Sequence, residues 1–357
     1  MQTKKKSILD SNVLYTVIAI IVGFIIGAIF LAVAGISPAV AYGKLIDSVF
    51  GKPKYLVWTL IYASPIILTG LSVAFSFRTG VFNIGAEGQF VVGAMVATVV
   101  GILVDVPAVI HVPLCLIASA AAGALWSWVV GLLKVKRGIH EVLSFIMFNW
   151  IAFYLSNYVV NLDIIRRESG GEASKDVLAS ARILFPEGVR KFLDCSAANW
   201  GVVLAIVIAI IMWVIIEKTT LGYKLKAVGF NNDAAKFSGI NSDKSVLTAL
   251  SISGALAGLG GAVQILGMGG RLSQYAGQEG FGFQGITVAL IAGSSPIGCI
   301  FAGIFYGAMK YGGSKLTMVQ APTEVIDIIM GCVIIIIAIS HVFKAILKRV
   351  TAKKEAK

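Results

Sequence analysis

The sequence has few charged residues. They occupy only 13% of its 357 positions, whereas a soluble domain carries about 25%. Hydrophobic residues account for 57%, and the mean hydropathy is +0.88. A fold in water cannot hide so much apolar surface, so the composition excludes an ordinary soluble domain and predicts an integral membrane protein.

Cysteine and histidine are also scarce. The four cysteines form no CxxC pair, and three of them lie inside apolar runs. The three histidines stand far apart, with no acidic residue at a ligand spacing. These patterns indicate neither a disulfide framework nor a metal site, and we expect neither.

The motifs of nucleotide hydrolysis are missing. No G-x-x-x-x-G-K-[ST] loop occurs, and no nucleophile and base form a recognisable set. Gly280, Gly282 and Gly285 match the dinucleotide fingerprint by letter, but no strand precedes them and no βαβ unit surrounds them. We therefore expect no catalytic residue, no cofactor bound by this chain and no enzyme activity of its own.

Long apolar runs are what the chain does have. A helix needs about 20 apolar residues to cross a hydrocarbon core of roughly 30 Å. Such runs lie at about 13–36, 57–77, 81–104, 110–133, 141–162, 200–216, 245–268, 283–295, 297–311 and 324–343. They predict an all-α integral membrane protein with about ten transmembrane helices in a single domain, 1–357.

Two of these runs allow a second interpretation. The first run is longer than the core of a signal peptide, which favours a spanning helix, although cleavage near Ala34 stays an alternative. The run after Phe283 is short, and turn-forming residues at 293–296 interrupt the chain there. The last three runs therefore include either a tight pair of helices or a re-entrant hairpin.

The net charge of +12 is explained by the side of the membrane on which Lys and Arg lie. With the N-terminus inside, the basic clusters fall on the cytoplasmic side, so we expect both termini to be cytoplasmic. These clusters lie at 4–6, 134–137, 217–243 and 344–349. Nucleic-acid binding is the weaker explanation of this charge, and we expect no nucleic-acid partner.

One long loop, at about 163–199, falls on the outer side. Its six basic and six acidic residues balance, as expected of a segment that is translocated. Three roles stay open for it, namely a cover for the outer mouth, a docking surface for a soluble partner, or a plain solvated loop.

The segment FRTGVFNIGAEGQF, residues 77–90, places polar groups at or inside the bilayer edge. Such groups are costly there unless they face protein or water. The glycines of this segment suit a broken helix, so we interpret Asn83, Glu87 and Gln89 as part of a translocation path. In the alternative interpretation, Arg78 snorkels to the headgroups and Glu87 only caps or pairs.

The segment EKTTLGYKLKAVGFNNDAAKFSGIN, residues 217–241, is too polar to cross the bilayer and too patterned for a linker. Asn232 or Asp233 can cap a short helix that runs through Phe237, and Gly239 can end it in a left-handed conformation. Such a helix either presses an exposed Phe237 into a groove of another protein or rests on lipid.

Taken together, FNIGAEGQF and KAVGFNNDAAKFSGI resemble the permeases of ATP-binding-cassette importers for nucleosides and simple sugars, within a broader family that includes branched-chain amino-acid permeases. The resemblance runs end to end. It implies a path formed by two permease subunits, identical or related, with ATP and Mg²⁺ bound by partner ATPase subunits. It also implies an extracytoplasmic substrate-binding protein or lipoprotein, contact with membrane lipid, and a multi-pass location in a bacterial cytoplasmic membrane.

By this resemblance the ATPase contacts a cytoplasmic coupling loop at about 217–243. Members of the family commonly have an arginine where this chain has Lys226 and a proline near Asn232, so this sequence departs from them at the helix start. The implied coupling residues are Lys226, Gly229, Asn232, Asp233, Ala234, Ala235, Lys236, Phe237, Ser238 and Gly239.

The expected solute is a nucleoside, because residues 77–90 look most like the nucleoside branch of the family. Phe82, Gln264 and Gln284 are candidates to stack on or hydrogen-bond its base. A simple sugar of the ribose type is the alternative. An ion-coupled secondary transporter is less favoured, because acidic candidates for coupling within the membrane are few, namely Glu87, Glu324 and Asp327.

Two glycine-rich patterns concern the architecture. GAEGQF at 85–90 is echoed by GQEGF at 277–281, and the topology puts the first inside and the second outside. Inverted repeats would produce this echo, so we hypothesise that the chain contains them. GALAGLGGA at 254–262 has the small residues that let membrane helices approach closely, and we expect it to pack helices.

Overall fold

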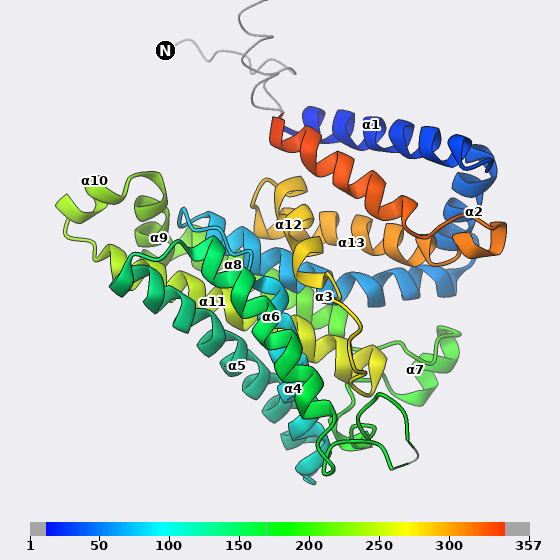
Figure 1. The fold of residues 1–357 in the computed structure, drawn as a ribbon, viewed down its shortest axis with the longest axis horizontal. Coiled ribbons are helices and arrows are strands. Elements are labelled where there is room, and N and C mark those ends of the chain that lie inside the picture. Colours follow the sequence, from blue (N-terminus) through cyan, green and yellow to red (C-terminus); the bar gives the residue numbers. More distant parts are fainter. Residues whose placement is uncertain (1–11, 169, 340–357) are drawn as a thin grey trace, which may run out of the picture. The chain divides into compact units, whose positions relative to one another are not determined.

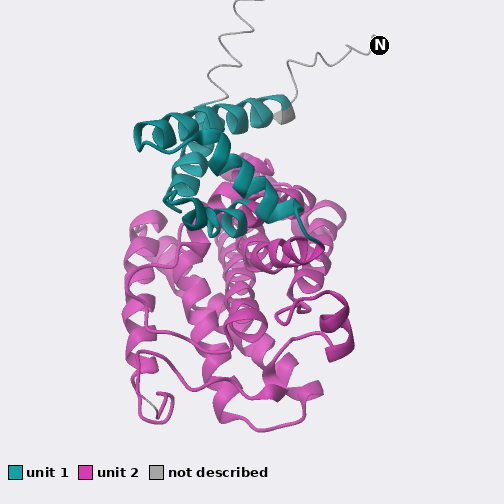
Figure 2. Cartoon of the chain, turned by 90° about the vertical axis from the view of Figure 1, so that its right-hand side faces the viewer, with its two compact units in different colours: residues 1–52, 309–357 teal, residues 53–308 magenta. Residues whose placement is uncertain are grey.

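Helices make up most of the computed structural model, which describes residues 12–168 and 170–339 (Figure 1). Within these residues the extended pairings are three isolated bridges, each of which involves the loop at 163–199. The all-α prediction is confirmed for this part of the chain. The chain divides into two compact units, Met1–Lys52 with Met309–Lys357, and Pro53–Ala308 (Figure 2).

Seven helices of the described residues are long and apolar enough to cross a membrane. They are Leu14–Val33, Pro53–Phe77, Ala86–Leu103, Ala108–Arg137, Glu141–Val160, Gly201–Lys218 and Ser242–Gly269. The three remaining predicted runs contain shorter or less apolar helices, namely Phe281–Ile291, Pro296–Gly313 and Val325–Ile339. The protein is a multi-pass helical membrane protein, and the count of ten crossings stays a prediction.

The first unit brings the start of the chain against its last described helix. Gly23 lies against Val333 there, and a Cβ atom at Gly23 would overlap that side chain. The Tyr42 hydroxyl donates to the Phe24 carbonyl at 2.6 Å. The helices of this unit are α1 (Asn12–Val33), α2 (Pro38–Phe50), η4 (Leu316–Val319) and Val325–Ile339. The sequence analysis missed α2, because its 13 residues are too few for a membrane span.

The second unit holds most of the helices. Its long helices before the coupling loop are α3 (Pro53–Phe77), α4 (Ala86–Leu103), α5 (Ala108–Arg137), α6 (Glu141–Val160) and α8 (Gly201–Lys218). The coupling loop and the chain after it form α9 (Thr220–Phe230), α10 (Asn232–Phe237), α11 (Ser242–Val263), the π-helical turn η3 (Gln264–Gly269), α12 (Phe281–Ile291) and α13 (Pro296–Gly313). The last residues of α13 belong to the first unit.

The core of the second unit is built around α11, which packs against α3, α4 and α5. Gly254 and Gly258 of α11 face Gly123 of α5, and a Cβ atom on either α11 glycine would overlap the α5 backbone. Helices in lipid gain no hydrophobic driving force from one another, so close packing through small residues holds them together. The packing role expected of residues 254–262 is confirmed.

The loop at 163–199 is fastened across helix ends. The Val177 N–H donates to the Gly270 carbonyl, and the Leu178 N–H donates to the Gly101 carbonyl, both at 2.8 Å. The loop therefore lies over the ends of α4 and η3, which argues against the plain solvated loop among its three interpretations. It contains two short helices, η2 (Ala179–Ala181) and α7 (Glu187–Phe192).

Candidate translocation and coupling site

The break predicted within residues 77–90 lies between α3 and α4. α3 ends at Phe77 and α4 begins at Ala86, so the predicted run at 81–104 is helical only in its later part. Gly80 adopts a φ of +73°, which favours glycine at that position. The Asn83 carboxamide oxygen accepts from the Gly85 N–H at 3.1 Å, a local turn that competes with continuation of the helix.

Asn83 and Gln89 form a reciprocal amide pair. Asn83 Nδ2 donates to Gln89 Oε1 at 2.8 Å, and Gln89 Nε2 donates to Asn83 Oδ1 at 2.9 Å. Asn83 Nδ2 also donates to the Ser253 hydroxyl at 2.6 Å, and Ser253 in turn donates to the Ser72 carbonyl at 2.7 Å. Both amide side chains are fully buried. In this conformation the network joins α3, α4 and α11, and its polar groups are directed at one another.

Glu87 holds the start of α12. One carboxylate oxygen accepts from the Gly280 N–H and the other from the Gly282 N–H, each at 2.7 Å. These N–H groups belong to the first turn of α12 and its cap, where a carboxylate also complements the helix dipole. Glu87 is only 1% exposed. In this structure Glu87 therefore caps α12, and its role in the translocation path stays a prediction.

The echoing segments of the sequence meet at this point. Glu87 of GAEGQF binds the amides of Gly280 and Gly282, and Phe90 stacks on Phe281 with ring centroids 4.8 Å apart. Gly282 is needed there, since a Cβ atom would overlap the backbone of Glu87. Of the glycines that match a dinucleotide fingerprint by letter, Gly282 and Gly285 therefore serve close packing, while Gly280 adopts a φ of +83°. The inverted-repeat hypothesis itself stays a prediction.

The other path candidates are only partly brought together. Gln284 is one turn into α12 and 7% exposed, and its side-chain oxygen is buried without a hydrogen-bond partner among the described residues. It therefore lies near the Glu87 contact. Phe82 instead stacks on Phe77 with centroids 5.2 Å apart, and Gln264 is half-buried at the start of η3. A common site for these three side chains stays a prediction.

The coupling loop forms the expected short helix, α10, but its cap differs from the prediction. The side chain of Asn231, rather than Asn232 or Asp233, accepts from the Ala234 N–H at 3.0 Å. Asn231 has extended backbone angles, φ −158° and ψ 107°, as a cap residue requires, whereas the two residues after it are already helical. Gly239 ends the segment with a φ of +79°, which confirms the left-handed end.

Two exposed phenylalanines lie at the ends of α9 and α10. Phe237 is 94% exposed and Phe230 is 89% exposed. Between α9 and α10 lies a hollow of about 440 Å³, whose lining includes Tyr223, Ala227 and Ala234. Exposed aromatic side chains beside a hollow are typical of a surface that a partner covers.

The family of the chain follows from comparison with known proteins. A family model described as branched-chain amino acid transport system / permease component matches residues 55–338. The chain belongs to this permease family. The predicted resemblance is thereby confirmed, and no solved structure matches the chain.

Three relatives of the permease are similar over most of their length. The guanosine ABC transporter permease protein NupP of Bacillus subtilis (strain 168) is 39% identical over 345 residues, 96% of this chain and 98% of that protein. The nucleoside ABC transporter permease protein NupB of Lactococcus lactis subsp. cremoris (strain MG1363) is 33% identical, with 96% and 95% covered. The glucose ABC transporter permease protein TsgB13 of Haloferax volcanii is 30% identical, with 92% and 87% covered.

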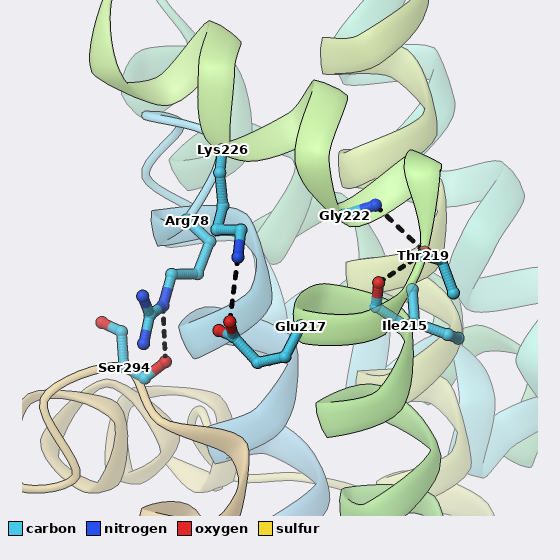
Figure 3. Close-up of polar contacts among 7 residues, drawn as sticks. All are labelled: Arg78, Ile215, Glu217, Thr219, Gly222, Lys226 and Ser294. Atoms are coloured by element: carbon cyan, nitrogen blue, oxygen red, sulfur yellow. Dashed lines mark hydrogen bonds and ion pairs between the residues drawn. The ribbon is translucent and has the colours of Figure 1, made fainter.

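In this permease the base of the coupling loop is tied to the membrane helices (Figure 3). The Lys226 ammonium, predicted at the ATPase contact, pairs with the Glu217 carboxylate at 2.9 Å. The Thr219 hydroxyl caps α9 by accepting from the Gly222 N–H at 3.2 Å. Arg78 Nε donates to the Ser294 carbonyl at 3.0 Å, so Arg78 is bonded to protein rather than only to headgroups.

Sequence reasoning missed several partners in these contacts. Ser72 and Ser253 gave no signal, because single serines in apolar runs are common and these two lie 181 positions apart. Glu217 did carry a signal, as an acidic residue at the end of an apolar run and before a lysine-rich loop. Ser294 acts through its backbone carbonyl, which no side-chain pattern can reveal.

Proposed function

We propose that this permease forms half of the translocation path of an ATP-driven importer for nucleosides in a bacterial cytoplasmic membrane. The observation that carries the proposal is α10, a capped helix on a membrane protein that presents a phenylalanine with 94% of its side chain exposed. An apolar side chain fixed in this way on an ordered helix suits a groove on a partner protein. The near full-length similarity to NupP and NupB supports both the class and the solute.

The proposal includes the partners of an importer. A separate ATPase binds ATP and Mg²⁺ and contacts Asn232 to Gly239. A second permease subunit, identical or related, completes the translocation path. An extracytoplasmic binding protein or lipoprotein delivers the solute. With about ten crossings and the coupling loop inside, both termini are cytoplasmic. The loop at 163–199 is then on the outer side, where its fastening over α4 and η3 suits a cover or a docking surface.

Two other functions are less well supported. The similarity to a glucose permease keeps a sugar solute as the alternative. An ion-coupled transporter would need acidic groups that are free to bind an ion, but both carboxylate oxygens of Glu87 already accept backbone N–H groups. The other acidic candidates, Glu324 and Asp327, are exposed residues of the first unit.

The test is to purify the chain from its host in mild detergent, identify its companions by mass spectrometry, and reconstitute the complex in liposomes. We expect an ATPase to copurify, and guanosine or another nucleoside to enter on addition of ATP. Uptake should survive ionophores that collapse proton and sodium gradients. Uptake of glucose but not nucleosides would favour the sugar alternative. Transport by the chain alone on an ion gradient would contradict the whole proposal.

A further inference from the structure

The strongest unexplained feature of the second unit is that α12 is held at both ends by one short stretch of chain. Glu87 binds its N-terminal amides, and Arg78 Nε binds the Ser294 carbonyl just after its last residue. An anion at the N-terminus and a cation at the C-terminus both complement the dipole of a helix. Residues 78–87, which are the connection between α3 and α4 together with the first two residues of α4, therefore clamp α12.

The turn that Arg78 grips is a defined structure. Gly293 and Ser294 have φ angles of +57° and +56°, and the Ser294 N–H donates back to the Ala289 carbonyl at 2.8 Å. This bond closes the C-terminal end of α12, as left-handed residues commonly do. A hydrogen bond from the charged, half-buried Arg78 to this turn is stronger than one between neutral groups. Displacement of Arg78 would therefore displace the end of α12.

The same stretch of chain touches the coupling loop. Gly229 of α9 lies directly on the backbone of Arg78 to Gly80, and a Cβ atom at Gly229 would overlap the Arg78 carbonyl oxygen. From the other side, Gly80 faces the Gly229 backbone. Since no side chain separates the two backbones, there is no flexible group between them to absorb a displacement.

The remaining links run from α10 to α9. The Asn231 side chain caps α10, while its own N–H donates to the Ala227 carbonyl of α9 at 3.1 Å. The ion pair of Lys226 with Glu217 fixes α9 on α8 (Figure 3). A continuous series of short contacts therefore leads from the exposed surface of α10, through Gly229, to the clamp on α12.

We propose that the Gly80–Gly229 contact and Arg78 pass movement of the coupling loop to α12, and that Arg78 is a positioning residue for transport. The proposal rests on the proposed function, because it assumes that an ATPase moves α10. It assigns a positioning role to Arg78, whose only expected role was to snorkel, and a specific backbone contact to Gly229, which was expected among the coupling residues.

The main test uses Arg78→Met in the complete complex of permease, ATPase and binding protein in liposomes. Met has a side chain of similar length but no hydrogen-bond donor, so it cannot replace the bond from Arg78 Nε to the Ser294 carbonyl. We expect the complex to assemble and hydrolyse ATP while nucleoside uptake per ATP falls about tenfold. Arg78→Lys keeps a charged donor and should lose less. Gly229→Ala disrupts the contact between α9 and residues 78–80, because the added methyl group overlaps the Arg78 carbonyl oxygen. It should also lower nucleoside uptake per ATP.

The matched control is Gly43→Ala in α2, where a Cβ atom meets nothing within 4 Å. It should leave uptake per ATP unchanged. If Arg78→Met and Gly229→Ala keep the wild-type ratio of uptake to ATP hydrolysed, the proposed transmission from the coupling loop to α12 is wrong although the importer function stands. If all three variants at the linkage lose the folded complex, these contacts are structural supports and the proposal is overturned. If the wild-type complex takes up nucleoside equally well with and without ATP, the proposed function itself is wrong.

Discussion

Replacing Glu87 tests whether this residue serves the fold or the path. Glu87→Ala leaves the N–H groups of Gly280 and Gly282 without their acceptor in a site where Glu87 is 1% exposed. An unsatisfied buried donor costs about 1–3 kcal/mol, so the loss should be roughly 2–6 kcal/mol. That is a large part of a typical net stability of about 5–15 kcal/mol. We expect little folded protein from this variant.

Glu87→Gln is the sharper variant because it nearly preserves shape. Its remaining oxygen can accept from one of the two N–H groups, while its NH₂ group faces the other donor. The expected loss is about 1–3 kcal/mol, which leaves a folded protein with a lower melting temperature. The measurement is size-exclusion chromatography of samples heated in detergent. The control is Glu168→Gln, whose carboxylate is 90% exposed and whose change should stay within about 0.5 kcal/mol.

The two roles of Glu87 give different results. A structural cap predicts that melting temperature falls while uptake per folded complex changes little. If Glu87→Gln melts like the wild type but abolishes uptake, the carboxylate acts on the solute or the path and the capping interpretation is refuted.

Three further predictions concern the loops. Phe237→Ala should weaken ATPase copurification about tenfold or more with an unchanged melting temperature, because the side chain is 94% exposed. An equal loss of folded permease would make α10 a structural element. A membrane-impermeant maleimide should label Ser196→Cys in intact cells but Ser238→Cys only after lysis, and the reverse would invert the topology. Cys195 should be alkylated more slowly than Ser196→Cys, with a rate that rises with pH, because burial raises the pKa of its thiol and leaves little thiolate near neutral pH. Equal rates at pH 7 would contradict that burial.

The sequence predicts helices well here because a membrane leaves little choice. Backbone groups in lipid must be paired within the segment, so a long apolar run is nearly always a helix. Every predicted run contains a helix in the described residues. The last run, at 324–343, extends past residue 339 and so lies partly outside them. The errors are local, such as α2 and the start of α4 at Ala86, where a short helix or an asparagine turn leaves no mark on hydropathy.

The contacts of the site were much harder to predict. Three successive residues, Asn231, Asn232 and Asp233, can all cap a helix, and only the backbone angles select the first. The partners of Glu87 lie 193 and 195 positions away and are backbone amides, which no side-chain pattern identifies. The local spacing of polar residues therefore located the segment at 77–90. The role of Glu87 within it depends on backbone N–H groups that are distant in the sequence, and local spacing cannot identify these.

The length of α12 connects these contacts with transport. Its 11 residues rise about 16 Å, roughly half of a hydrocarbon core of about 30 Å. Its C-terminal turn lies beside Arg78, at the base of the cytoplasmic coupling loop under the proposed topology. Its N-terminus is then near the middle of the membrane, where unpaired N–H groups are costly and where transporters with broken helices bind their substrates. Glu87 thus occupies a depth at which a carboxylate must have partners. The side-chain oxygen of Gln284, which has no hydrogen-bond partner among the described residues, lies one turn further along α12. A solute group that donates a hydrogen bond would satisfy that oxygen.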